Sequence, residues 1–169
     1  MRAADIMTRN VVSVSPETPA SHVVRLCLTQ GTTGVPVIDR DRRLAGMIGQ
    51  SNLIRGPVTG TARRALWLQL LAAGMAGPEH LARLGDVSAD RIMNSNVVST
   101  NEAAPIEKVA KLLVEHDIEL LPVVRDGTLT GIIGRSDVLS AFARLAEKVH
   151  KESAHRKIGQ TETGSTRVP

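Results

Sequence analysis

Two short stretches of the chain share a spacing of side chains that suits nucleotide binding. The later one, LTGIIGRSDVL at 129–139, reads as an apolar strand, a turn with glycine, and a helix that begins near Ser136 and Asp137. The earlier one, LAGMIGQSNLI at 44–54, repeats the pattern but has Asn52 in place of Asp137. A helix N-terminus attracts a phosphate, and a carboxylate beside it can accept hydrogen bonds from a ribose diol. We therefore predict a ribose-binding position at Asp137 and a weaker one at Asn52, which carries no charge.

A simpler interpretation of the same residues is structural. Aspartate and serine are both common at the start of a helix because their side chains accept hydrogen bonds from free backbone N–H groups. By residue type, Ser136 serves as a helix cap, and Asp137 can do so without binding any ligand. Both interpretations of Asp137 stay open at the level of sequence.

Other kinds of chemistry find little support. No histidine is placed by pattern to activate Ser136 as a nucleophile, and the chain lacks a Walker-type phosphate loop with its lysine. The five histidines show no metal-ligand spacing: His22, His80, His116, His150 and His155. We therefore predict a binding module and not an enzyme, with no catalytic residue, no metal site and no required cofactor.

Composition narrows the class of protein. The 169 residues are 42% hydrophobic and 22% charged, which is ordinary for a soluble globular protein of one or two small domains. Aromatic residues make up 1%, so base-stacking platforms for nucleic acid are not expected. No apolar run approaches the roughly 20 residues that span a membrane, and MRAADIMTRN lacks a signal-peptide core. The lone Cys27 falls in a helical apolar pattern and is predicted to be a small buried residue. We expect a cytoplasmic protein without membrane contact.

The chain consists of two copies of one unit. NVVS at 10–13 returns at 96–99, and Pro36-Val37 returns as Pro122-Val123, at an offset of 86 residues (122 − 36) that shortens by one before Leu129. Each copy predicts the order strand, helix, strand, strand, helix, with first strands at 11–14 and 97–99 and a tight turn at Asp126-Gly127. A unit this small is marginal alone, so we expect the copies at 1–55 and 86–149 to pack face to face.

Two segments lie outside the copies. The segment 56–85 predicts helices at 61–73 and 78–84, which either cover the apolar surface of the pair or dock a protein partner; the first is favoured. The last helix is predicted to run to Val149, along Val138, Phe142 and Leu145. The polar segment 150–169 is predicted to be a disordered basic tail.

These motifs together resemble a tandem pair of CBS domains, the module named after cystathionine β-synthase. The first copy carries DIM…NVVSV…P and GVPVID…LAGMIGQSNL, and the second carries RIM…NVVST…P and LLPVVRDGTLTGIIGRSDVL. The resemblance implies an α/β (α+β) fold of two β-α-β-β-α units related by a pseudo-twofold axis, with two clefts between them. It implies an adenine nucleotide (AMP, ADP or ATP) or a related adenosyl compound as regulatory ligand, and a homodimer as the assembly.

The resemblance also implies which residues line each cleft, because a CBS pair draws its ribose carboxylate from one unit and its base contacts from the other. The main cleft would use Val11, Val12, Thr32, Thr33, Arg135, Ser136 and Asp137. The second, weaker cleft would use Gln50, Ser51, Asn52, Val97, Val98 and Glu119. The chain departs from the family where a serine or threonine often precedes the aspartate by three residues, since Gly134 and Gly49 stand there. The alternative function is a structural association module whose clefts bind nothing.

Overall fold

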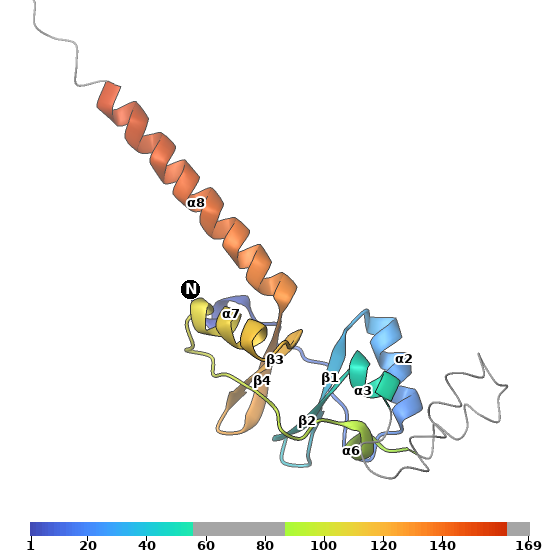
Figure 1. The fold of residues 1–169 in the computed structure, drawn as a ribbon. Coiled ribbons are helices and arrows are strands. Elements are labelled where there is room, and N and C mark those ends of the chain that lie inside the picture. Colours follow the sequence, from blue (N-terminus) through green and yellow to red (C-terminus); the bar gives the residue numbers. More distant parts are fainter. Residues whose placement is uncertain (56–86, 162–169) are drawn as a thin grey trace, which may run out of the picture.

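The computed structural model describes residues 1–55 and 87–161 and contains two units of the same design (Figure 1). The first unit is built from α1 (Ala3–Ile6), α2 (Ala20–Gln30), β1 (Gly34–Ile38), β2 (Leu44–Gly49) and α3 (Gln50–Arg55). The second contains α6 (Ala89–Ile92), α7 (Ile106–Glu115), β3 (Leu120–Arg125), β4 (Thr128–Gly134) and α8 (Arg135–Thr161). The helices predicted at 61–73 and 78–84 fall outside the described residues.

Each unit has a two-stranded antiparallel hairpin, and the predicted first strand is reduced to one parallel bridge. Val14 bridges Val37 in the first unit, and Thr100 bridges Val123 in the second. Of the predicted strand 11–14 only Val14 pairs, and the predicted strand 97–99 ends one residue before the bridge at Thr100, so both predictions were wrong in extent. In the first unit the chain bends on both sides of the bridge, because the Val11 N–H donates to Arg9 O (2.9 Å) before it and the Ser15 N–H donates to Thr18 Oγ1 (3.1 Å) after it.

The second hairpin turn follows its residue types, and the first does not. Asp126 and Gly127 join β3 to β4 with φ angles of 52° and 82°, the type I′ turn that the sequence predicts. In the first hairpin the Asp39 N–H donates to Arg43 O (3.0 Å), which closes a turn of three residues that contains Arg42 at φ 61°. The two turns touch across the molecule, because the Leu44 N–H donates to Gly127 O (3.0 Å) and the Leu129 N–H donates to Arg42 O (3.3 Å).

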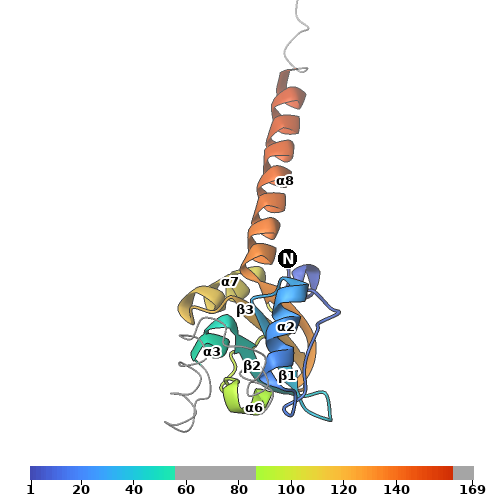
Figure 2. The ribbon, with the colours of Figure 1, turned by 90° about the vertical axis from the view of Figure 1, so that its right-hand side faces the viewer.

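The two cores exchange their first short helices. Ile6 and Met7, at the end of α1, are buried in the second unit's core with α7, β3 and β4. Ile92, in α6, is buried in the first unit's core with α2, β1 and β2. α1 contacts β4 and the start of α8, and Figures 1 and 2 both show α6 below β2. Since each core is completed by a helix of the other copy, the units are held together by buried apolar surface.

Helix α8 corrects one prediction. The last helix does not end at Val149, because α8 continues to Thr161 and projects away from the body of the molecule (Figures 1 and 2). Part of the predicted disordered tail is therefore helical. Residues 150–158 contain neither proline nor glycine and are rich in Lys, Glu, Ala and Arg, so local propensity favours continuing the helix. No helix of the described ranges is long and apolar enough to cross a membrane.

Candidate functional site

The site is formed where a strand leads directly into a helix, and this joint occurs once in each unit. In the second unit the N–H of Gly134, the last residue of β4, donates to Asp137 Oδ2 (2.7 Å). In the first unit the N–H of Gly49 donates to Asn52 Oδ1 (2.9 Å). In both, the third helical residue reaches back to the strand end, which is one half of a capping box. The backbone of the joint is thus the same, and the charge on the side chain differs.

Asp137 makes the capping contact that the sequence also assigned to Ser136. Ser136 is the second residue of α8 and is exposed, and no hydrogen bond of its hydroxyl is seen in the described residues, so its prediction as the cap was wrong. The reason is that α8 begins one residue earlier, at Arg135. One oxygen of Asp137 is engaged by Gly134, whereas Oδ1 has no hydrogen-bond partner within residues 1–55 and 87–161. Asp137 is half-buried.

Arg135 is already held by its own unit. Its Nε donates to Ile118 O (3.0 Å), and its guanidinium forms an ion pair with Asp117 Oδ1 (2.8 Å). Asp117 has a left-handed φ of 48°, in the loop between α7 and β3. Arg135 therefore ties the start of α8 to this loop, and a phosphate that draws on the same guanidinium would compete with Asp117.

Residues predicted for different clefts are joined by backbone hydrogen bonds at these joints. The N–H of Gln50 donates to Thr33 O (3.1 Å), and the N–H of Arg135 donates to Glu119 O (3.3 Å). Each pair combines one residue predicted for the main cleft with one predicted for the second. Leu120 Cδ1 lies 3.3 Å from the position that a Cβ on Gly34 would occupy, so the starts of β1 and β3 meet here.

The remaining predicted residues surround these joints. The Thr32 hydroxyl donates to Gly34 O (2.8 Å) and so shapes the entry to β1. Val11 is half-buried and Val12 is 43% exposed, whereas Val98 packs against the second core. Three further predicted residues have a simple placement: Gln50 and Ser51 are exposed at the start of α3, and Val97 is half-buried. No hydrogen bond in the described residues joins Val11 or Val12 to Asp137.

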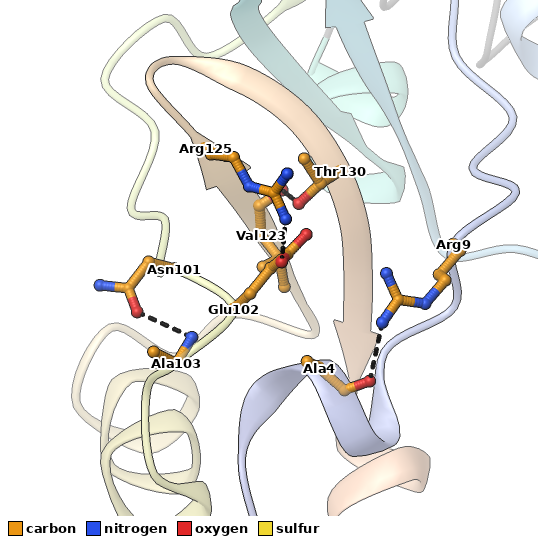
Figure 3. A network of polar contacts seen from close by, with 8 residues as sticks. All are labelled: Ala4, Arg9, Asn101, Glu102, Ala103, Val123, Arg125 and Thr130. Atoms are coloured by element: carbon orange, nitrogen blue, oxygen red, sulfur yellow. Dashed lines mark hydrogen bonds and ion pairs between the residues drawn. The ribbon is translucent and has the colours of Figure 1, made fainter.

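A charged network in the second unit was not anticipated from the sequence (Figure 3). Arg125 donates to Glu102 and forms an ion pair with it, and Thr130 lies beside them. The hydrogen bond from Arg125 lowers the pKa of Glu102 below its ordinary value; Thr130 and the charge of Arg9 act in the same direction, against partial desolvation. The network lies beside α1, because the Ala4 N–H donates to Glu102 O (3.0 Å). Its members are far apart in the chain, so only their charges were visible in the sequence.

Cys27 is buried as predicted, and burial raises the pKa of its thiol. A raised pKa disfavours the reactive thiolate. The described residues also contain no group of three or more His, Cys, Asp or Glu side chains that could hold a metal ion.

The CBS domain family matches residues 3–58 and 86–144, which cover both joints. The chain belongs to the CBS domain family. It is 29% identical over 154 residues to the uncharacterized protein MJ1426 of Methanocaldococcus jannaschii, covering 84% of this chain and 91% of that protein. It is 29% identical over 140 residues to MJ1225 of the same organism, covering 82% of this chain but only 46% of the relative.

A CBS pair of known structure is similar to this chain. CBSX2 of Arabidopsis thaliana, crystallised in complex with AMP, is 27% identical to this chain with a TM-score of 0.65. The similarity covers 85% of this chain and 97% of that one. The predicted α+β fold, with two CBS units in tandem, is thereby confirmed.

Proposed function

We propose that this CBS pair is a regulatory module, not a catalyst, and that it senses an adenine nucleotide or a related adenosyl ligand beside the N-terminus of α8. The observation that carries the proposal is the geometry of Asp137. Its Oδ2 holds the Gly134 N–H at 2.7 Å, which fixes the carboxylate in place, while Oδ1 has no partner in the described residues. An ionised, positioned oxygen of this kind can accept a hydrogen bond from a ribose hydroxyl. The AMP complex of CBSX2 supports the choice of nucleotide class.

The first unit supplies the contrast. Asn52 makes the same contact to Gly49, but its only oxygen is the one engaged, and the rest of its amide group is a donor without charge. The cleft at α3 is therefore proposed to bind nucleotide more weakly. Gln50, Ser51, Val97, Val98 and Glu119 complete this second cleft in the proposal.

Arg135 offers a way to transmit binding. In the main cleft the base would contact Val11, Val12, Thr32 and Thr33, and the phosphate would lie near Ser136 and Arg135. Arg135 now pairs with Asp117, so a phosphate that attracts the guanidinium competes with that ion pair. Binding would then release the loop before β3 and shift the orientation of α8, because α8 begins at Arg135.

The decisive experiment is calorimetric titration of AMP into the parent chain and into Asp137→Asn. Asparagine preserves the acceptor for the Gly134 N–H, as Asn52 does for Gly49, and removes only the charge. We expect AMP affinity to fall about tenfold or more, since a charge-assisted hydrogen bond is worth about 1.5–3 kcal/mol. Asn52→Asp is the reciprocal variant. We expect it to raise the AMP affinity of the second cleft, unless Glu119, which is exposed, repels the phosphate.

Two further measurements sharpen the test. Gly134→Ser returns the hydroxyl that the family often has, and a Cβ there meets nothing closer than 3.5 Å, so this variant should fold and bind AMP more tightly. A thermal-shift screen with ADP, ATP and S-adenosylmethionine ranks the ligands, because a ligand of the folded state raises apparent stability. The nucleotide proposal fails if Asp137→Asn binds AMP as the parent does.

A second candidate function, association of two copies, is favoured by the surface of α8. Leu139, Phe142 and Leu145 are exposed along this helix, at 67%, 44% and 37%. Their burial between two copies would remove apolar surface from water, and we therefore propose a homodimer that is held at least in part by α8. Phe142→Glu is expected to shift the mass measured by light scattering from dimer to monomer. A parent chain that is monomeric at micromolar concentration contradicts this candidate.

A further inference from the structure

A cavity of about 330 Å³ lies near the hairpin turns, at the opposite end of β4 from Asp137. Its lining consists of two arginines, two small polar residues and three apolar ones: Arg9, Arg42, Asn10, Ser13, Val11, Ile38 and Leu129. Leu129 is five residues before Gly134 on β4, so roughly 17 Å of strand separates the cavity from the carboxylate joint. The cavity does not include Asp137, and the only lining residue that it shares with the proposed nucleotide cleft is Val11.

The charged residues of the lining are both arginines. No carboxylate lines the cavity; Asp39 and Asp41 border a neighbouring one, and Asp39 Oδ1 accepts from the Asp41 and Arg43 N–H groups (2.9 and 2.8 Å). The Arg42 guanidinium has no hydrogen bond or ion pair in the described residues. Arg9 makes a long hydrogen bond to Ala4 O (3.4 Å) and keeps further N–H groups free, although its charge also acts on Glu102.

The backbone holds Arg42 firmly at this place. Its φ of 61° is left-handed, which an arginine seldom adopts, and its carbonyl accepts from the Leu129 N–H across the two turns. The contact that joins the units therefore also fixes the edge of the cavity. A charged side chain on a constrained turn is a better anion ligand than one on a mobile loop, since less conformational freedom is lost on binding.

The positions in the other unit that correspond to the two arginines carry no charge. At the repeat offset, Arg9 corresponds to Ser95, and counting back from β4 places Gly127 at the position of Arg42. The asparagine and the serine of the lining recur as Asn96 and Ser99. The two arginines are thus additions to one side of a symmetric scaffold, and the scaffold does not require them.

We propose that this cavity binds the phosphate group of a phosphorylated small molecule. Arg9 and Arg42 supply charge-assisted hydrogen bonds to the dianion, Asn10 and Ser13 supply neutral donors, and Val11, Ile38 and Leu129 contact the apolar part of the ligand. The volume is at the lower end of small-molecule sites, which suits a ligand no larger than a mononucleotide or a sugar phosphate.

Titration calorimetry with inorganic pyrophosphate tests the proposal on the full chain. We expect one ion per chain and a loss of affinity of about tenfold or more in Arg9→Gln and in Arg42→Asn. Asparagine is chosen because it tolerates a left-handed φ, and glutamine can still donate to Ala4 O. Arg25→Gln, an exposed arginine on α2, is the matched control for net charge and should bind like the parent.

One further variant distinguishes this cavity from the nucleotide site at the start of α8. Asp137→Asn should leave pyrophosphate affinity unchanged while it weakens AMP, so this cavity and the nucleotide proposal can fail separately. Unfolding midpoints show which variants fold. If Arg42→Asn does not fold, the affinity of Arg9→Gln for pyrophosphate decides the test. The proposal is overturned if millimolar pyrophosphate does not bind to the parent, if both arginine variants bind as well as the parent, or if Arg25→Gln loses as much affinity.

Discussion

The two units share a backbone and differ at a few polar positions. Each has the same strand-to-helix joint, the same hairpin and the same borrowed helix in its core. Asn52 in the first unit corresponds to Asp137 in the second, and Val14 and Pro16 correspond to Thr100 and Glu102. The comparison teaches that glycines and buried apolar residues preserve the scaffold, whereas single polar substitutions determine what each half can bind.

The exchange of short helices gives the largest expected effect. A Cβ on Gly131 would lie 2.5 Å from Met7 Sδ, and one on Gly46 would lie 2.8 Å from Met93 Cγ and 3.1 Å from Asn94 O. We expect Gly131→Ala and Gly46→Ala each to lower the free energy of unfolding by about 1–3 kcal/mol, measured by urea denaturation.

The two glycine variants should differ in how they are rescued. Met7→Ala should cost less stability in the Gly131→Ala background than in the parent, because only side-chain atoms of Met7 obstruct that position. Met93→Ala should rescue Gly46→Ala less, because the Asn94 carbonyl remains. Gly134→Ala, whose new Cβ meets nothing closer than 3.5 Å, is the control and should be close to neutral. Equal losses in all three glycine variants would contradict the steric explanation.

The next largest expected effect concerns a buried hydroxyl that the second unit has and the first unit lacks. Thr100 is 6% exposed, and its Oγ1 has no hydrogen-bond partner in the described residues, whereas the first unit has Val14 at the matching bridge. Thr100→Val should raise the free energy of unfolding by about 1 kcal/mol, and Val14→Thr should lower it by about 1–3 kcal/mol. Thermal unfolding measures both, and a destabilised Thr100→Val would show that the hydroxyl is satisfied in solution.

The joint itself gives a moderate effect on stability. Asp137→Ala and Asn52→Ala each remove the acceptor for a strand-end N–H and should cost about 0.5–2 kcal/mol, the range found for helix caps. Asp137→Asn keeps that acceptor and should unfold close to the parent. Chemical denaturation compares the three variants, and a large loss in Asp137→Asn would mean that charge, and not only the cap, holds this helix end.

The smallest expected effect depends on pH. Because the pKa of Glu102 is lower in the folded state than in the unfolded state, the folded state binds fewer protons, and stability is lost as pH falls through the acid range. Glu102→Gln should therefore flatten the unfolding midpoint between about pH 5 and pH 3. Pro16 holds the matching position in the first unit and cannot titrate. If the unfolding midpoints of the parent and of Glu102→Gln fall equally as pH is lowered, groups other than Glu102 cause the acid sensitivity.

Sequence alone determined the repeated unit, the hairpin turn and the helix faces, because these depend on local patterns. Asp126-Gly127 requires a turn with positive φ at both residues, and Gly31 ends α2 at φ 61° as its residue type predicts. The contrast of Asn52 with Asp137 was equally visible, since it needs only an alignment of the two copies.

Tertiary structure decided what depends on partners far along the chain. It placed Met7 of the first unit in the core of the second, and Ile92 of the second unit in the core of the first. It also paired Arg135 with Asp117 and brought Arg9 to the same cavity as Arg42. It also reduced the predicted first strands to single bridges. No local pattern specifies such contacts, because the free energy that selects them comes from burial and charge pairing between segments that meet only after the chain has folded.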